Sequence, residues 1–126
     1  MLRACGRLLK PGGRTAFFTI FVSPGLSRRD HRRAVRAGPR AVTSRREHRP
    51  LLEAAGFVEI EETDVTEEFR QTCGRWIQHA RRLERGLRAT VGSELFDEQQ
   101  ADRRAMLAAI EEGLLSRSLF VAGTPA

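Results

Sequence analysis

The segment with the most potential for chemistry runs from Ser23 to Glu47, directly after an apolar stretch at residues 14–22. It holds hydroxyl, imidazole and guanidinium groups, among them Ser23, His31 and a series of arginines. The apolar stretch predicts a strand, and ligands of open α/β sheets bind outside the carboxyl ends of the strands. These groups could therefore orient a polar small molecule, although the same residues could also form a solvated surface loop.

Other reactive side chains lack the spacing that catalysis or metal binding requires. The histidines His31, His48 and His79 stand among arginines, without the spacing of metal ligands. Ser23 and Ser27 have no nearby His–Asp pattern that would activate a hydroxyl group. We therefore predict no catalytic residue and no metal ligand in this chain.

The first half of the chain must position the candidate groups through one helix and one strand. Residues 2–9 predict a helix, which Lys10-Pro11-Gly12-Gly13 ends. Residues 14–22 form an apolar run in which neither face of the expected strand is polar. This predicts a strand buried on both sides. Residues 25–43 carry six closely spaced arginines and Gly38-Pro39, so we expect an irregular or partly helical loop that is the least ordered internal segment.

The second half predicts a helix, an edge strand, a helical hairpin and a last strand. Ser44-Arg45-Arg46-Glu47 fits a capping box for a helix that ends at Gly56, although Pro50 moves the expected start toward residue 49. Residues 57–65 alternate apolar and acidic side chains, as an edge strand does, so Glu61, Glu62 and Asp64 read as a solvated face. We expect Thr66 and Ser93 to cap the two helices of the hairpin.

Composition and charge narrow the class of protein. The 126 residues are 40% hydrophobic, which fits one globular domain and excludes wholesale disorder. Residues 1–56 hold thirteen Arg or Lys against three acids, whereas residues 57–126 hold nine against thirteen. Cys5 and Cys73 are interpreted as reduced, buried thiols. With neither a membrane-spanning run nor a signal-peptide core, we expect a cytoplasmic protein that does not contact a membrane.

Two passages resemble class I S-adenosylmethionine (SAM)-dependent methyltransferases. Leu8-Leu9-Lys10-Pro11-Gly12-Gly13-Arg14 is similar to the "LKPGG" turn before that family's fifth strand. Residues 51–60, LLEAAGFVEI, are similar to the "LLxxAGF" passage before the sixth strand. A closing strand at Ser118–Ala122 completes the order, so the resemblance spans the chain but covers only the later half of the family's domain.

The resemblance implies an α/β fold of known topology. It is a partial class I methyltransferase fold with the last three strands in the order 5-7-6, the final strand antiparallel between the other two, and a helical hairpin before it. We expect a single incomplete methyltransferase-like domain over residues 1–126. Its parts are a helix and buried strand at 1–22, an Arg-rich loop at 23–49, a helix and edge strand at 50–65, the hairpin at 66–115 and the closing strand at 116–126.

The family's cofactor is SAM, which a glycine-rich turn after the first strand receives. The chain has no G-x-G-x-G, so we expect no cofactor-binding residue and no SAM binding by this chain alone. In a complete relative, a small-molecule methyl acceptor would meet the substrate side of the fold. Its candidate residues here are Ser23, Pro24, Arg28, His31 and Trp76. Trp76 fits core packing better than a substrate platform.

We therefore expect the C-terminal part of a SAM-dependent methyltransferase that lacks the cofactor-binding half and is inactive alone. A first alternative is a subunit of a split enzyme, completed by an N-terminal half at the exposed edge of the strand at 14–22. A second is a basic module that binds nucleic acid or another acidic partner through residues 28–49. The sequence lacks RNA-binding aromatics, zinc spacing and a recognition helix, which argues against nucleic acid.

Overall fold

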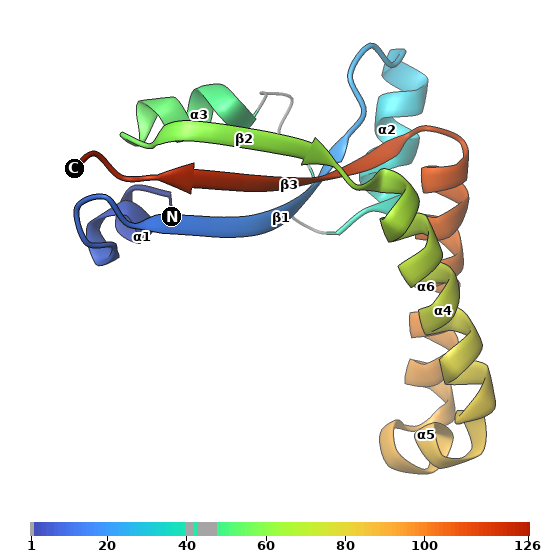
Figure 1. Cartoon of the computed structure of the whole chain (residues 1–126). Coiled ribbons are helices and arrows are strands. Elements are labelled where there is room, and N and C mark those ends of the chain that lie inside the picture. The colour runs from blue at the N-terminus through green and yellow to red at the C-terminus, as the bar shows by residue number, and fades with distance from the viewer. Residues whose placement is uncertain (1, 40–41, 43–47) are drawn as a thin grey trace.

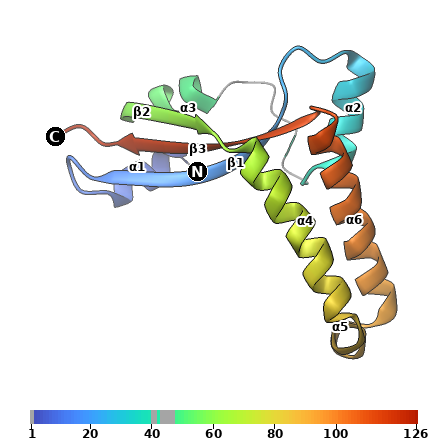
Figure 2. The same cartoon turned by 45° about the vertical axis from the view of Figure 1, so that its right-hand side comes forward.

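A computed structural model describes residues 2–39, 42 and 48–126 of the chain. Three strands lie side by side, and a long helical hairpin leads away from one end of their sheet (Figure 1). In chain order the elements are α1 Leu2–Leu8, β1 Arg14–Val22, α2 Arg28–Ala37, α3 His48–Ala54, β2 Val58–Asp64, α4 Thr66–Arg82, α5 Glu84–Val91, α6 Ser93–Glu111 and β3 Leu115–Gly123. The view in Figure 2 shows the same separation of the sheet from the hairpin, with α5 at the far tip.

The sheet has the strand order β1-β3-β2, and β3 runs antiparallel to both neighbours. The β1–β3 register is regular from Arg14 opposite Gly123 to Val22 opposite Leu115. The β2–β3 register shifts between Val58 and Glu61, as a β-bulge does. The expected topology, with the final strand inserted between the other two, is confirmed.

Strand β3 supplies buried side chains to two hydrophobic clusters, because successive side chains point to opposite faces of a sheet. The first cluster joins β3 to α2, α4 and α6, and its buried members are Ala34, Val42, Phe69, Cys73, Ala109, Ile110, Leu114 and Leu115. The second joins β3 to α3, and its buried members are Leu52, Phe57, Phe120 and Ala122. The core therefore sits on both faces of the central strand.

Three burial predictions were wrong. No residue of β1 is buried, and Phe18 is 55% exposed, because β1 is an edge strand and helices cover its Phe18 face only toward Val22. Cys5 is exposed on α1, whereas Cys73 is buried as expected. Trp76 is 47% exposed because α4 buries the neighbouring stripe Phe69, Cys73, Ile77 and Ala80.

The Arg-rich segment contains a ten-residue helix, α2, where we expected an irregular or partly helical loop. The helix forms because Ser27 Oγ accepts the Asp30 N–H at 3.1 Å, and its one buried side chain, Ala34, joins the first cluster. The expected capping box at residues 44–47 lies outside the described residues. Helix α3 begins at His48 with Pro50 in its first turn, as the sequence indicates.

The other helix ends differ in part from expectation. Gly56 closes α3 with φ of 92°, and the N–H of Phe57 bonds Leu52 O, as in a Schellman motif. The prediction that Thr66 and Ser93 cap their helices was wrong, because the N-cap positions are Val65 and Gly92. At α4 the carboxylate of Asp64 takes that role and accepts the Thr66 N–H at 2.8 Å.

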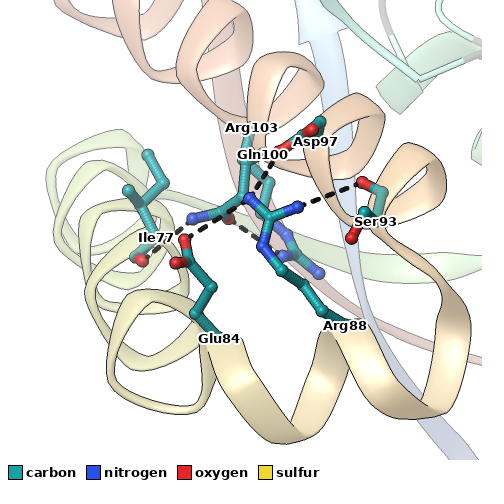
Figure 3. A network of polar contacts seen from close by, with 7 residues as sticks. All are labelled: Ile77, Glu84, Arg88, Ser93, Asp97, Gln100 and Arg103. Carbon is teal, nitrogen blue, oxygen red and sulfur yellow. Dashed lines mark hydrogen bonds and ion pairs between the residues drawn. The ribbon is translucent and has the colours of Figure 1, made fainter.

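A polar network holds the tip of the hairpin together (Figure 3). The Arg88 guanidinium donates to Asp97 at 2.7 Å and to Ser93 O at 3.4 Å, which ties α5 to the start of α6. Deeper in the hairpin, the buried amide of Gln100 donates to Ile77 O at 3.3 Å. These bonds fix α4, α5 and α6 against one another beside the buried side chains of Ile77, Ala80 and Phe96.

Candidate functional site

A cleft of about 710 Å³ opens at the end of the sheet where β1 ends and β2 continues into α4. Its wall is made by the end of β1, the turn at residues 23–27, the start of α2, the start of α3, the end of β2 and the start of β3. This volume lies within the range of small-molecule sites. The sequence predicts a ligand site at this end of β1, and the cleft lies there.

Hydroxyl groups on one face of the sheet form the floor of the cleft. Side chains directly opposite each other in an antiparallel pair share a face. Phe21 lies opposite Ser116, and Asp64 lies opposite Ser118. Ser23 Oγ and Ser116 Oγ are 2.7 Å apart, and Ser118 Oγ donates to Glu62 Oε1 at 2.9 Å. The hydrogen bonds fix the floor in one arrangement.

An imidazole closes the cleft on the side of α3. His48 Nε2 and Thr19 Oγ1 share a hydrogen bond of 3.0 Å. The His48 ring lies between Phe21 and Phe120, with centroid distances of 5.8 Å and 5.7 Å. Burial lowers the pKa of His48, and the Glu62 carboxylate opposes that shift. His48 is therefore neutral at pH 7 and can accept or donate a hydrogen bond.

Carboxylates line the cleft on the side of β2. Hydrogen bonds from the Thr66 side chain and backbone N–H hold the pKa of the Asp64 carboxyl below its ordinary value, so Asp64 is ionised at neutral pH. Arg49 also lines the cleft, but its Nη1 donates to Ile60 O at 2.9 Å. Among the described residues, neither Glu62 nor Asp64 forms an ion pair.

The structure brings four of the five candidate residues together. Ser23, Pro24, Arg28 and His31 all line the cleft, whereas Trp76 lies on α4 outside it. Sequence reasoning missed further polar lining residues, among them His48, Arg49, Glu62, Asp64, Ser116 and Ser118. The alternation of β2 and of the closing strand was the available signal for the last four.

The described part of the chain does not fit a cofactor cradle or a metal centre. Of its positive-φ glycines, only Gly25 follows a strand closely, and no second glycine accompanies it. No group of three or more His, Cys, Asp or Glu among these residues could hold a metal ion. Within the same residues, no helix is both long and apolar enough to cross a membrane.

No family model matches the chain, and no curated protein sequence matches it. Its fold is nevertheless similar to solved methyltransferases. A phosphoethanolamine N-methyltransferase from Haemonchus contortus, solved with phosphomonomethylethanolamine and S-adenosylhomocysteine, matches at TM-score 0.80 and 18% identity. A candidate sarcosine dimethylglycine methyltransferase from Galdieria sulphuraria matches at TM-score 0.83 and 12% identity. A cyclopropane synthase from Mycobacterium tuberculosis matches at TM-score 0.75 and 13% identity.

These matches cover 98–99% of this chain but only 29%, 46% and 48% of the three proteins. Identities this low show the fold and not the activity. Because they span nearly the whole chain, the matches include strands β1 and β2, the antiparallel strand β3 between them and the hairpin before β3. The chain therefore has the fold of the C-terminal part of SAM-dependent methyltransferases.

Proposed function

We propose that this chain is the acceptor-side, C-terminal part of a SAM-dependent methyltransferase that acts on a small molecule. The observation that carries the proposal is the cleft at the end of β1, in a sheet whose order and direction match those enzymes. The cleft volume of about 710 Å³ suits a small acceptor. Two neighbours named for small amine substrates support the same kind of acceptor.

In this proposal the cofactor is held by residues outside this sequence. The 126 residues contain no G-x-G-x-G, and binding of SAM needs a backbone that approaches the ligand closely. Methyl transfer depends largely on holding the acceptor atom in line with the sulfonium methyl group, and such positioning can supply about 7–11 kcal/mol of a barrier. The role of this chain is then to bind and orient the acceptor.

A complementing N-terminal half, in the same longer polypeptide or in a separate one, would meet β1. The outer edge of β1 has no strand beside it among the described residues. Its nine residues therefore offer backbone N–H and C=O groups to a further strand. The half-exposed Phe18 adds apolar surface beside that edge. A split enzyme remains the second candidate, and the exposed edge is the observation that favours it.

Calorimetry with SAM tests the proposal directly. The chain alone should give no measurable binding, whereas a mixture with a polypeptide that carries a strand and a G-x-G-x-G turn should bind SAM and transfer its methyl group. The matched control is the same polypeptide with the glycines of that turn replaced by alanine. Micromolar binding of SAM by the chain alone, or no binding by the mixture, would overturn the proposal.

A further inference from the structure

The charged side chains of the cleft lie on opposite sides of it. Glu62 and Asp64 come from β2, whereas Arg28 and His31 come from α2, which follows β1. Strand β3 separates β1 from β2, so the two outer strands are about 10 Å apart. The cleft therefore has an acidic side and a basic side, with the serine hydroxyls between them.

The acidic side is anionic and open to a cation. Asp64 keeps its charge at neutral pH because Thr66 stabilises the carboxylate. Glu62 uses one oxygen to accept the Ser118 hydroxyl, which leaves its other oxygen for a ligand. The neighbouring Arg49 donates to a backbone carbonyl, and no ion pair joins it to either acid in the described part of the chain.

The basic side combines three independent features that favour an anion. The α2 N-terminus carries the partial positive charge of a helix dipole, and Arg28 stands at its first position. Asp30, the carboxylate of that first turn, forms its ion pair with Arg33 at 3.2 Å, so it does not neutralise Arg28. The Nε2 atom of His31 is buried and has no hydrogen-bond partner among the described residues. A buried nitrogen of this kind costs free energy unless a ligand or water satisfies it.

From this division we infer that the cleft binds a small zwitterion, with its amine against Glu62 and Asp64 and its carboxylate or phosphate against Arg28 and His31. The inference rests on the proposed function, in which this molecule is the methyl acceptor. The lining side chains occupy part of the space between the strands, so a molecule whose two charges are only a few atoms apart fits best. The neutral imidazole of His48 then lies beside the amine and can accept a hydrogen bond from it.

Titration of the full chain, followed by NMR, tests the inference without the cofactor. The probes are O-phosphoethanolamine and β-alanine as zwitterions, with ethanolamine and inorganic phosphate as compounds of one charge. We expect both zwitterions to bind saturably, and the better one at least tenfold more tightly than either compound of one charge. The comparison of O-phosphoethanolamine with β-alanine tells which anionic group the basic side prefers.

Paired variants assign the two sides. Glu62→Gln should weaken zwitterion and ethanolamine binding by about tenfold, as loss of one charge-assisted hydrogen bond implies, and should leave phosphate binding unchanged. Arg28→Gln should weaken zwitterion and phosphate binding by about tenfold and should leave ethanolamine binding unchanged. The matched controls are Glu61→Gln, on the opposite face of β2, and Arg29→Gln, which does not line the cleft. Glu62→Gln keeps a side-chain oxygen that can accept the Ser118 hydroxyl, so far-ultraviolet circular dichroism should show an unchanged fold.

Two results would overturn the inference: equal affinity for ethanolamine and the zwitterions, or an effect of Glu61→Gln as large as that of Glu62→Gln. The proposed function fails separately. Zwitterion binding without methyl transfer by the complemented pair would contradict the function alone. Methylation of an uncharged acceptor, without zwitterion binding, would contradict only the inference drawn here.

Discussion

Replacement of Phe120 by alanine should destabilise the fold and change the site together. Phe120 is 1% exposed, and its ring stacks on Phe17 at 5.6 Å and lies 5.7 Å from the His48 ring. It also joins the cluster that holds α3 against the sheet. The variant leaves a cavity below His48, so the imidazole loses part of the burial that lowers its pKa.

The expected cost follows from the burial of the ring. Phe→Ala substitutions in cores cost about 3–5 kcal/mol, against a total stability of about 6–19 kcal/mol for a chain of 126 residues. The variant should therefore remain folded but marginal. Phe18→Ala is the matched control, because Phe18 is half exposed and its main partner is the Arg117 guanidinium at 4.1 Å. That change should cost about 1–2 kcal/mol.

Urea unfolding, followed by circular dichroism, gives the two free energies, and NMR titration gives the pKa of His48. We expect the pKa of His48 to rise toward 6.5 in Phe120→Ala and to stay unchanged in Phe18→Ala. Equal costs for the two variants would refute the burial argument. An unchanged His48 pKa in Phe120→Ala would refute the claim that this ring encloses the imidazole.

Three further variants test single interactions by urea unfolding. Asp64→Ala should cost about 1 kcal/mol at pH 7 through loss of the cap on α4. Because the folded pKa of Asp64 lies below 3.8, this difference should be present above pH 4 and vanish as the pH falls through the folded pKa; a constant difference would contradict the cap. Because burial lowers the folded pKa of His48 below 6.5, the parent chain should lose stability as the pH falls from above 6.5 through that folded pKa. His48→Gln has no such group at this position and should not show this loss. Gly56→Ala should cost about 1–2 kcal/mol because φ is 92°, although the new methyl group meets no neighbour; a neutral result would argue against strain there.

The sequence predicts the positions of the strands well because each strand signal is sharply bounded, whereas the strand order was predicted from the resemblance to class I methyltransferases. Gly12-Gly13 and Ser23-Pro24-Gly25 enclose β1, and the observed strand spans the expected residues 14–22. Burial is less predictable, since hydrophobicity reports what a strand can bury and not what lies beside it. Phe18 illustrates this, because it belongs to an apolar run and its side chain is nevertheless half exposed.

The candidate site is predictable in place and only partly in composition. The end of β1 marks the cleft because it follows from strand direction alone. Glu62 and Asp64 are exposed, as a solvated face requires, but Glu61 lies on the opposite face, and alternation does not tell which segments border the cleft beside Glu62 and Asp64. His48 is 29 residues from Thr19 along the chain, and their hydrogen bond exists only because α3 lies over that face. Contacts between distant segments of this kind leave no local pattern.

Strand β3 links the stability of the chain to its site, since its alternation serves both. Leu115 points to the face of α4 and α6 and is fully buried there, whereas Phe120 points to the opposite face under α3. Between them, Ser116 and Ser118 share the face of Phe120 but lie toward the end of the sheet where the cleft opens. A shift of the β3 register by one residue would exchange its two faces, so Leu115 would point toward α3, Phe120 toward α4 and α6, and the serines away from the cleft. Selection for a stable core in this chain therefore also holds the hydroxyl floor of the cleft in register.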